Sequence, residues 1–142
     1  MSPWVSFESS TKSFNNPRTK DLIVGPNTLT WGRQYALDVP SEQMPYIVPL
    51  TAVEIPTWFG SLSRVVNHVL ISAGSEERFR DDIVAFAERL GNSAKEVNVQ
   101  LEVQEGGVHD DPFLDFLISP YPRNVVSLTP LIIDWLKDKI AS

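Results

Sequence analysis

The stretch VLISAGSEERFRDDIVAFAERL, residues 69–90, decides the fold. It opens with the wholly apolar run Val69-Leu70-Ile71, which predicts a strand buried on both faces. Gly74 or Ser75 can then cap a helix, and Gly91-Asn92 ends it. The apolar residues between these signals recur at helical spacing: Phe79, Ile83, Phe86, Ala87 and Leu90. We therefore expect a buried strand followed directly by an amphipathic helix.

Strands and helices are expected to alternate on both sides of this stretch. Residues 97–104 alternate valine and leucine with polar residues, which is typical of a strand close to a sheet edge. Thr129 as N-cap and Pro130 at the first helical position predict a C-terminal amphipathic helix. The opening Ser2-Pro3-Trp4 predicts the end of a further strand. We expect an α/β fold of about three parallel strands with flanking helices.

The segment between the opening and the central stretch is rich in loops. Prolines between residues 40 and 56 forbid a long helix or a central strand there. One short helix is expected after Pro26, with Asn27 or Thr28 as its N-cap. Because the segment is also apolar, we interpret it as a cover over another part of the molecule.

The composition restricts the class of protein. A chain of 142 residues with 42% hydrophobic and 21% charged residues is typical of one globular domain. The net charge of −6 argues against nucleic acid or an anionic membrane as a partner. The absence of cysteine excludes disulfides and thiolate chemistry. No apolar run approaches the ~20 residues of a membrane span and no secretory signal is visible, so we expect a cytoplasmic protein.

An acid and a histidine follow the two central strands. Glu77 lies behind the first and His109 behind the second, and loops leaving neighbouring parallel strands converge on one crevice. A carboxylate that orients a histidine is the base half of nucleophilic catalysis. The nucleophile is missing, because no serine lies in a G-x-S-x-G pentapeptide. We expect no cofactor, and no metal, because His68 and His109 lack a ligand spacing.

The central stretch and VNVQLEVQEGGVHDDPFL, residues 97–114, together resemble the C-terminal part of an α/β-hydrolase of the hormone-sensitive-lipase-like branch, fold-3. Residues 74–82 follow the branch's motif G-x-x-[DE]-x-L-x-D-[DE], with Phe79 in place of the common leucine, which implies that Glu77 is the triad acid. Gly106-Gly107-Val108-His109 matches the Gly-x-x-His context of the triad histidine. The resemblance implies a strand end in residues 1–5, a cap-like segment in 6–62 and the C-terminal βαβα part of the core in 63–142.

The chain departs from that pattern in important places. The oxyanion loop, the serine elbow and the strands before them belong to the N-terminal half of the fold, which this sequence lacks. Arg78 also stands where the branch usually has an apolar residue. We therefore expect a partial serine carboxylic-ester hydrolase that is inactive alone, and that takes an ester-type small molecule only if completed.

Other interpretations of these residues stay open. Glu77 can be a helix N-terminal carboxylate, with Glu76 and Asp81 as the other candidates for the acid. His109 can be a surface loop residue, and we expect a structural role for His68. Four aromatic residues can line a pocket, although core packing is favoured: Trp31, Tyr35, Trp58 and Phe59.

Two functions compete with the partial enzyme. The chain can be a binding or assembly protein derived from a hydrolase, self-associating through its alternating strand and C-terminal helix. It can also be half of a split esterase, completed by another chain that carries the serine. Either function gives cover to the open hydrophobic sheet edge that a missing N-terminal half would leave.

Overall fold

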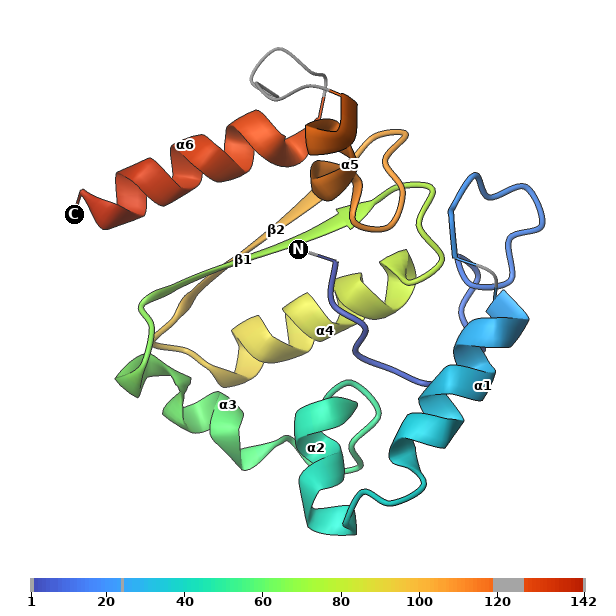
Figure 1. Cartoon of the computed structure of the whole chain (residues 1–142). Coiled ribbons are helices and arrows are strands. Elements are labelled where there is room, and N and C mark those ends of the chain that lie inside the picture. Colours follow the sequence, from blue (N-terminus) through green and yellow to red (C-terminus); the bar gives the residue numbers. More distant parts are fainter. Residues whose placement is uncertain (1, 24, 119–126, 142) are drawn as a thin grey trace.

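The structure is a computed structural model that describes residues 2–23, 25–118 and 127–141. Its sheet has two parallel strands, β1 (His68–Gly74) and β2 (Asn98–Gln104). They pair in register from His68 opposite Asn98 to Gly74 opposite Gln104. The crossover that parallel pairing requires is α4 (Arg80–Ser93), which packs on both strands (Figure 1). The chain is therefore a mixed α/β structure.

The other helices surround this unit. In Figure 1, α6 and α4 lie on opposite sides of the strands, and α1, α2 and α3 gather below them. The helices α2 and α3 are short because prolines interrupt the backbone hydrogen bonds around them. The bounds are α1 (Gly25–Ala36), α2 (Met44–Ile47), α3 (Thr57–Ser61), α5 (Asp111–Ile118) and α6 (Leu128–Ile140), with 3-10 turns at Ser41–Gln43 and Leu62–Arg64. No helix in the described ranges is long and apolar enough to cross a membrane.

The expected boundaries of α4 were wrong at both ends. The helix begins at Arg80 rather than after Gly74 or Ser75, because the intervening residues form a turn bound to the end of β2. It continues through Gly91 to Ser93, since its amide ladder reaches Ala94, whose N–H donates to the carbonyl of Leu90. The predicted apolar face is confirmed, with all five of its residues buried: Phe79, Ile83, Phe86, Ala87 and Leu90.

The other helix starts also differ from expectation. The N-cap of α6 is Ser127, whose Oγ accepts the N–H of Thr129 at 3.1 Å. The Thr129 hydroxyl donates instead to the carboxylate of Asp115 in α5, so it ties two helices together. The helix α1 begins at Gly25, ahead of the N-cap positions that we expected.

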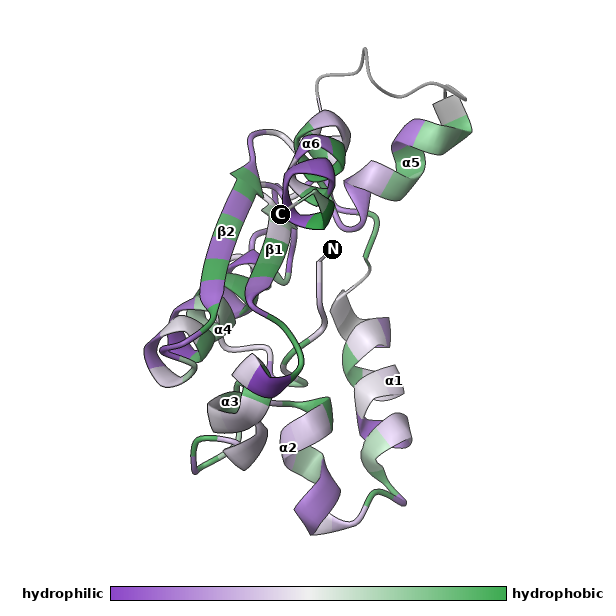
Figure 2. Cartoon of the chain, turned by 90° about the vertical axis from the view of Figure 1, so that its left-hand side faces the viewer, coloured by the Kyte–Doolittle hydropathy of each residue, from purple (hydrophilic) through white to green (hydrophobic). Residues whose placement is uncertain are grey.

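The strand β1 is buried only in its second half. Residues 71–74 are buried, whereas His68, Val69 and Leu70 are half-buried, so the expectation of burial on both faces along the whole run was wrong. Within the described residues β1 pairs with β2 alone, which leaves its other edge unpaired. Figure 2 shows hydrophobic and hydrophilic residues alternating along β2, as its sequence predicted.

The expected third strand is not found in the described part of the N-terminal stretch. Residues 2–10 carry no regular secondary structure, and Met1 lies outside the described residues. Pro3 has no amide hydrogen to donate to a ladder. The carbonyl of Val5 accepts the N–H of Leu50 at 3.3 Å, and Leu50 lies in a turn rather than in a strand. These residues therefore pack beside the sheet without extending it.

One hydrophobic core joins the loop-rich segment to the sheet. Its buried members come from the N-terminal stretch (Val5, Phe14), α3 (Phe59), β1 (Ile71, Ala73) and α4. The rings of Phe59 and Phe86 meet edge to face at 5.9 Å, so α3 packs directly against α4. The segment 6–62 is therefore packed against the βαβ unit through this core.

Candidate active site

The acid and the histidine that the sequence singled out lie in contact. Nδ1 of His109 is 2.7 Å from Oε1 of Glu77. The Glu77 side chain is fully buried (0% exposed), and the His109 side chain is 19% exposed. Because β1 and β2 run in parallel and in register, the two loops that carry these residues leave the sheet at the same end.

The turn that carries Glu77 is bound to the end of β2. The N–H of Ser75 donates to the carbonyl of Gln104 at 2.8 Å, and that of Glu76 donates to the carbonyl of Gly107 at 2.9 Å. Gly74 makes this approach possible, since a Cβ there would lie 2.2 Å from the Gly107 oxygen. The two loops can therefore touch only because position 74 has no side chain.

Both oxygens of the Glu77 carboxylate are engaged. Oε1 faces the imidazole, and Oε2 accepts the N–H of Gly74 at 2.9 Å. Since α4 begins only at Arg80, Glu77 lies outside its first turn, and an interaction with the helix dipole does not explain its burial. Asp81, an alternative acid, accepts the N–H of Ser13 at 2.8 Å instead. The structure thus brings Glu77 to the imidazole.

The imidazole of His109 has a carboxylate near each of its two nitrogens and an aromatic ring in contact with it. Its Nε2 is 3.6 Å from Oδ2 of Asp110, whose φ of 54° bends the loop, and its ring meets Phe79 edge to face at 5.3 Å. Burial lowers the pKa of His109, but the hydrogen bond and charge of Glu77, followed by the charges of Asp110 and Asp21, raise it. The net pKa lies above the ordinary value.

Arg78 ties the acid turn to the loop-rich segment. Its Nε donates to the carbonyl of Ile23 at 2.9 Å, and one of its terminal nitrogens donates to that of Phe14 at 2.5 Å. A guanidinium can satisfy two separate carbonyls in this way because it carries five N–H donors in a fixed plane. Sequence reasoning missed this role, since the carbonyls lie more than fifty residues away in the chain.

The described residues hold no nucleophile for this pair and no metal site. No serine hydroxyl in residues 2–23, 25–118 or 127–141 forms a hydrogen bond with Nε2 of His109. The same ranges contain no cluster of three His, Cys, Asp or Glu side chains that could hold a metal ion. His68 lies at the start of β1, the opposite end of the strand from Glu77, with its Nδ1 buried and unpaired.

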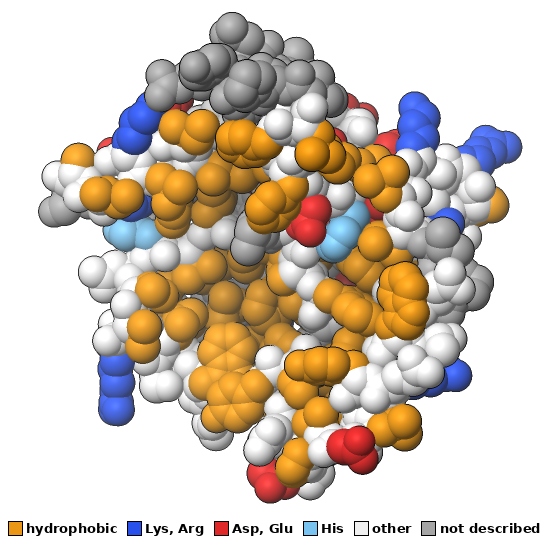
Figure 3. Space-filling view, viewed as in Figure 1, with side chains coloured by type: hydrophobic (Ala, Val, Ile, Leu, Met, Phe, Trp, Pro, Cys, Tyr) orange, Lys and Arg blue, Asp and Glu red, His pale blue; other side chains and the backbone are white. Residues whose placement is uncertain are grey.

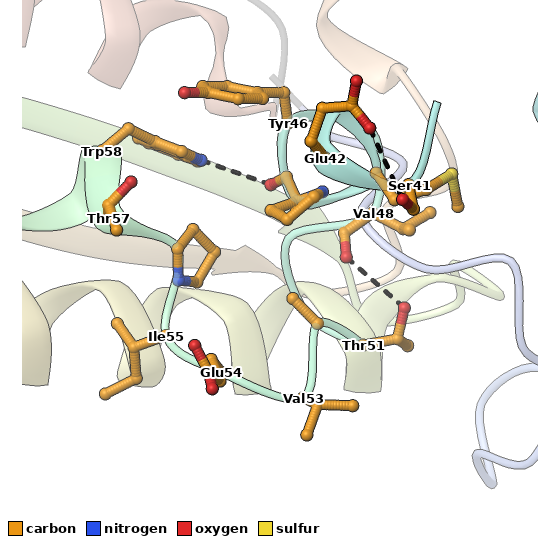
Figure 4. A pocket seen from close by; sticks show the side chains of 14 residues that line it. Ser41, Glu42, Tyr46, Val48, Thr51, Val53, Glu54, Ile55, Thr57 and Trp58 are labelled. Atoms are coloured by element: carbon orange, nitrogen blue, oxygen red, sulfur yellow. Dashed lines mark hydrogen bonds between the residues drawn. The ribbon is translucent and has the colours of Figure 1, made fainter. Parts of the chain in front are cut away.

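A cavity of about 460 Å³ lies apart from the pair, between α2 and α3 (Figure 4). Its wall includes Tyr46 and Trp58, whose rings stack at 6.4 Å, and neither His109 nor Glu77 lines it. Of the other expected aromatic residues, Phe59 is core, whereas Trp31 and Tyr35 are exposed at 57% and 66%. Core packing was therefore the wrong expectation for those two residues.

Comparisons of the chain with family models, with curated proteins and with solved structures find no match.

Proposed function

We propose that this chain carries the acid and histidine of a serine carboxylic-ester hydrolase of the α/β-hydrolase superfamily, without the serine. The observation that supports this function is the 2.7 Å contact between His109 Nδ1 and the fully buried carboxylate of Glu77. A carboxylate that holds the Nδ1 side of a histidine at the carboxyl end of parallel strands is what the base half of a Ser-His-acid triad requires.

The proposed function gives a role to each nitrogen of the ring. A carboxylate only accepts hydrogen bonds, so the proton of a neutral His109 lies on Nδ1, facing Glu77. Nε2 is then left with a lone pair. In a triad this nitrogen takes a proton from the serine and later returns it to the leaving alcohol. Glu77 holds the ring in this orientation and stabilises the imidazolium.

The proposed function predicts that the chain alone does not form an acyl-enzyme. A histidine and a glutamate without a nucleophile have no covalent route, and only weak general-base chemistry remains. The test is hydrolysis of p-nitrophenyl acetate by the purified chain, beside His109→Ala and a His68→Ala control. We expect no hydrolysis above buffer that depends on His109. Hydrolysis that His109→Ala abolishes would show that the chain holds its own nucleophile.

A second candidate function is association, as a non-catalytic protein derived from a hydrolase. It is favoured by the second edge of β1, which pairs with no other strand among the described residues, and by the hydrophobic side chains on the face that Figure 3 shows. Leu136 and Ile140 on α6 are exposed at 44% and 82%. A second copy of this chain would cover both features. A chain that carries the serine half is the alternative partner.

A further inference from the structure

The carboxylate of Asp21 joins the two loops that carry the candidate pair. Its Oδ1 accepts the backbone N–H of His109 at 3.1 Å, and its Oδ2 accepts that of Arg78 at 2.8 Å. Arg78 directly follows Glu77. One side chain therefore holds the peptide of the histidine and the peptide next to the acid, through hydrogen bonds that its negative charge strengthens.

Thr19 attaches the same segment to the other side of Glu77. Its hydroxyl donates to the carbonyl of Glu76 and accepts the N–H of Asp21. The acid is thus flanked by two peptides, at Glu76 and Arg78, that are both bound to residues 19–21. The backbone hydrogen bonds between the two loops themselves lie closer to the sheet, at residues 75 and 76. Asp21 is the bridge farther out, beside the imidazole.

We propose that Asp21 is a positioning residue for the candidate pair, setting the separation of the Glu77 and His109 side chains by holding their loops together. It acts through backbone amides and not on a substrate. The catalytic meaning of this inference rests on the proposed function. The effect of Asp21 on the two loops can be measured without catalysis, so this inference and the proposed function can fail separately.

Asp21→Asn is the sharpest variant, because it keeps the shape and removes the charge. Asparagine has one carbonyl oxygen, so its amide NH₂ must face one of the two N–H donors. We expect one loop to be released. The control is Asp38→Asn, which removes the same charge from an exposed aspartate beyond α1. Asp21→Ala, which removes both acceptors, should have the larger effect.

NMR of the full chain provides the test. The first measurement is amide hydrogen exchange at Arg78 and His109. Hydrogen bonds to a charged group are strong enough that losing one should speed exchange roughly tenfold or more. The second is the Nδ1 proton of His109, which should exchange faster with water in Asp21→Asn. The ring should also titrate at lower pH, and the His68 ring serves as a reference in the same sample.

The inference is overturned if Asp21→Asn folds and its His109 Nδ1 proton exchanges no faster than in Asp38→Asn. This holds even if the His109 ring of Asp21→Asn titrates at a different pH. The near-isosteric asparagine keeps the test decisive if Asp21→Ala fails to fold. A wild-type chain with no hydrogen-bonded Nδ1 proton would count against the proposed function. In that case the amide exchange rates at Arg78 and His109 still decide whether Asp21 holds the loops.

Discussion

The charge of Glu77 raises the pKa of the imidazole beside it. We expect Glu77→Gln to lower the pKa of His109, because the strongest influences that raise it are the hydrogen bond and charge of Glu77, and burial opposes them. The measurement is a proton NMR titration of the two histidine rings. Glu76→Gln is the matched control, one residue earlier in the same turn. Equal titration of His109 in the two variants would contradict the contact.

The carboxylate of Asp82 lowers the stability of the folded chain in a pH-dependent way. It is 6% exposed, its Oδ2 has no hydrogen-bond partner, and burial followed by the charges of Asp81 and Glu8 raises its pKa to about 6. The folded chain therefore binds this proton more tightly than the unfolded chain, whose carboxyl has the ordinary pKa of 3.8. Stability should fall as the pH rises between these two values and then level off.

Asp82→Asn should remove this cost. We expect the variant to gain up to about 3 kcal/mol of unfolding free energy above pH 7 and nothing below pH 4. Urea denaturation at a series of pH values measures the difference, with Asp38→Asn as the exposed control. The same gain at pH 4 and at pH 8 would show that ionisation of Asp82 is not its cause.

At the scale of the element, the close approach of the two loops depends on Gly74. A Cβ at that position would lie 2.2 Å from the backbone oxygen of Gly107, so Gly74→Ala must push the histidine loop away from the acid turn. We expect a loss of roughly 1–3 kcal/mol in unfolding free energy, as for other overpacked sites. The hydrogen-bonded Nδ1 proton of His109 should also be lost.

Gly60→Ala is the matched control for that prediction. Gly60 lies in the helix α3, and a Cβ there meets nothing within 4 Å. Alanine should therefore stabilise the chain by about 0.5–1 kcal/mol through its better helix propensity. If urea denaturation shows the two variants to be equally stable, the account of the loop approach is wrong.

Sequence patterns predicted the regular elements because these depend on local periodicity. The apolar spacing from Phe79 to Leu90 gave the buried face of α4, and alternation gave β2. The same patterns missed the start of α4, since the amides of residues 75 and 76 bind the last carbonyl of β2 and a carbonyl in the loop after it instead of opening a helix. They also missed Asp21, whose partners lie 57 and 88 residues away. Residues that directly follow successive strands can be recognised in the sequence as candidates for a site. The residues that hold the loops of the site together cannot, because they lie at no regular distance from their partners along the chain.

At the scale of the whole molecule, two features predict self-association: an edge of β1 that no strand in the described part of the chain pairs with, and the exposed apolar side chains of α6. Sedimentation should give a mass above that of one chain, rising with concentration. Leu136→Lys should lower that mass, because a lysine covered by the second copy would have to be desolvated. Leu37→Lys, at a residue that is 78% exposed beyond α1, is the control. A monodisperse monomer with a cooperative thermal transition would contradict this prediction.

The most direct test of the central claim is to supply a nucleophilic serine from another chain. The chain is mixed with a purified N-terminal half of a fold-3 esterase that carries the oxyanion loop and the G-x-S-x-G serine, and hydrolysis of p-nitrophenyl acetate is measured. The account predicts that hydrolysis appears only in the mixture, that His109→Ala abolishes it, that Glu77→Gln lowers it by orders of magnitude, and that His68→Ala leaves it unchanged. Hydrolysis in the mixture that survives His109→Ala would contradict the claim that His109 and Glu77 form the base half of a triad.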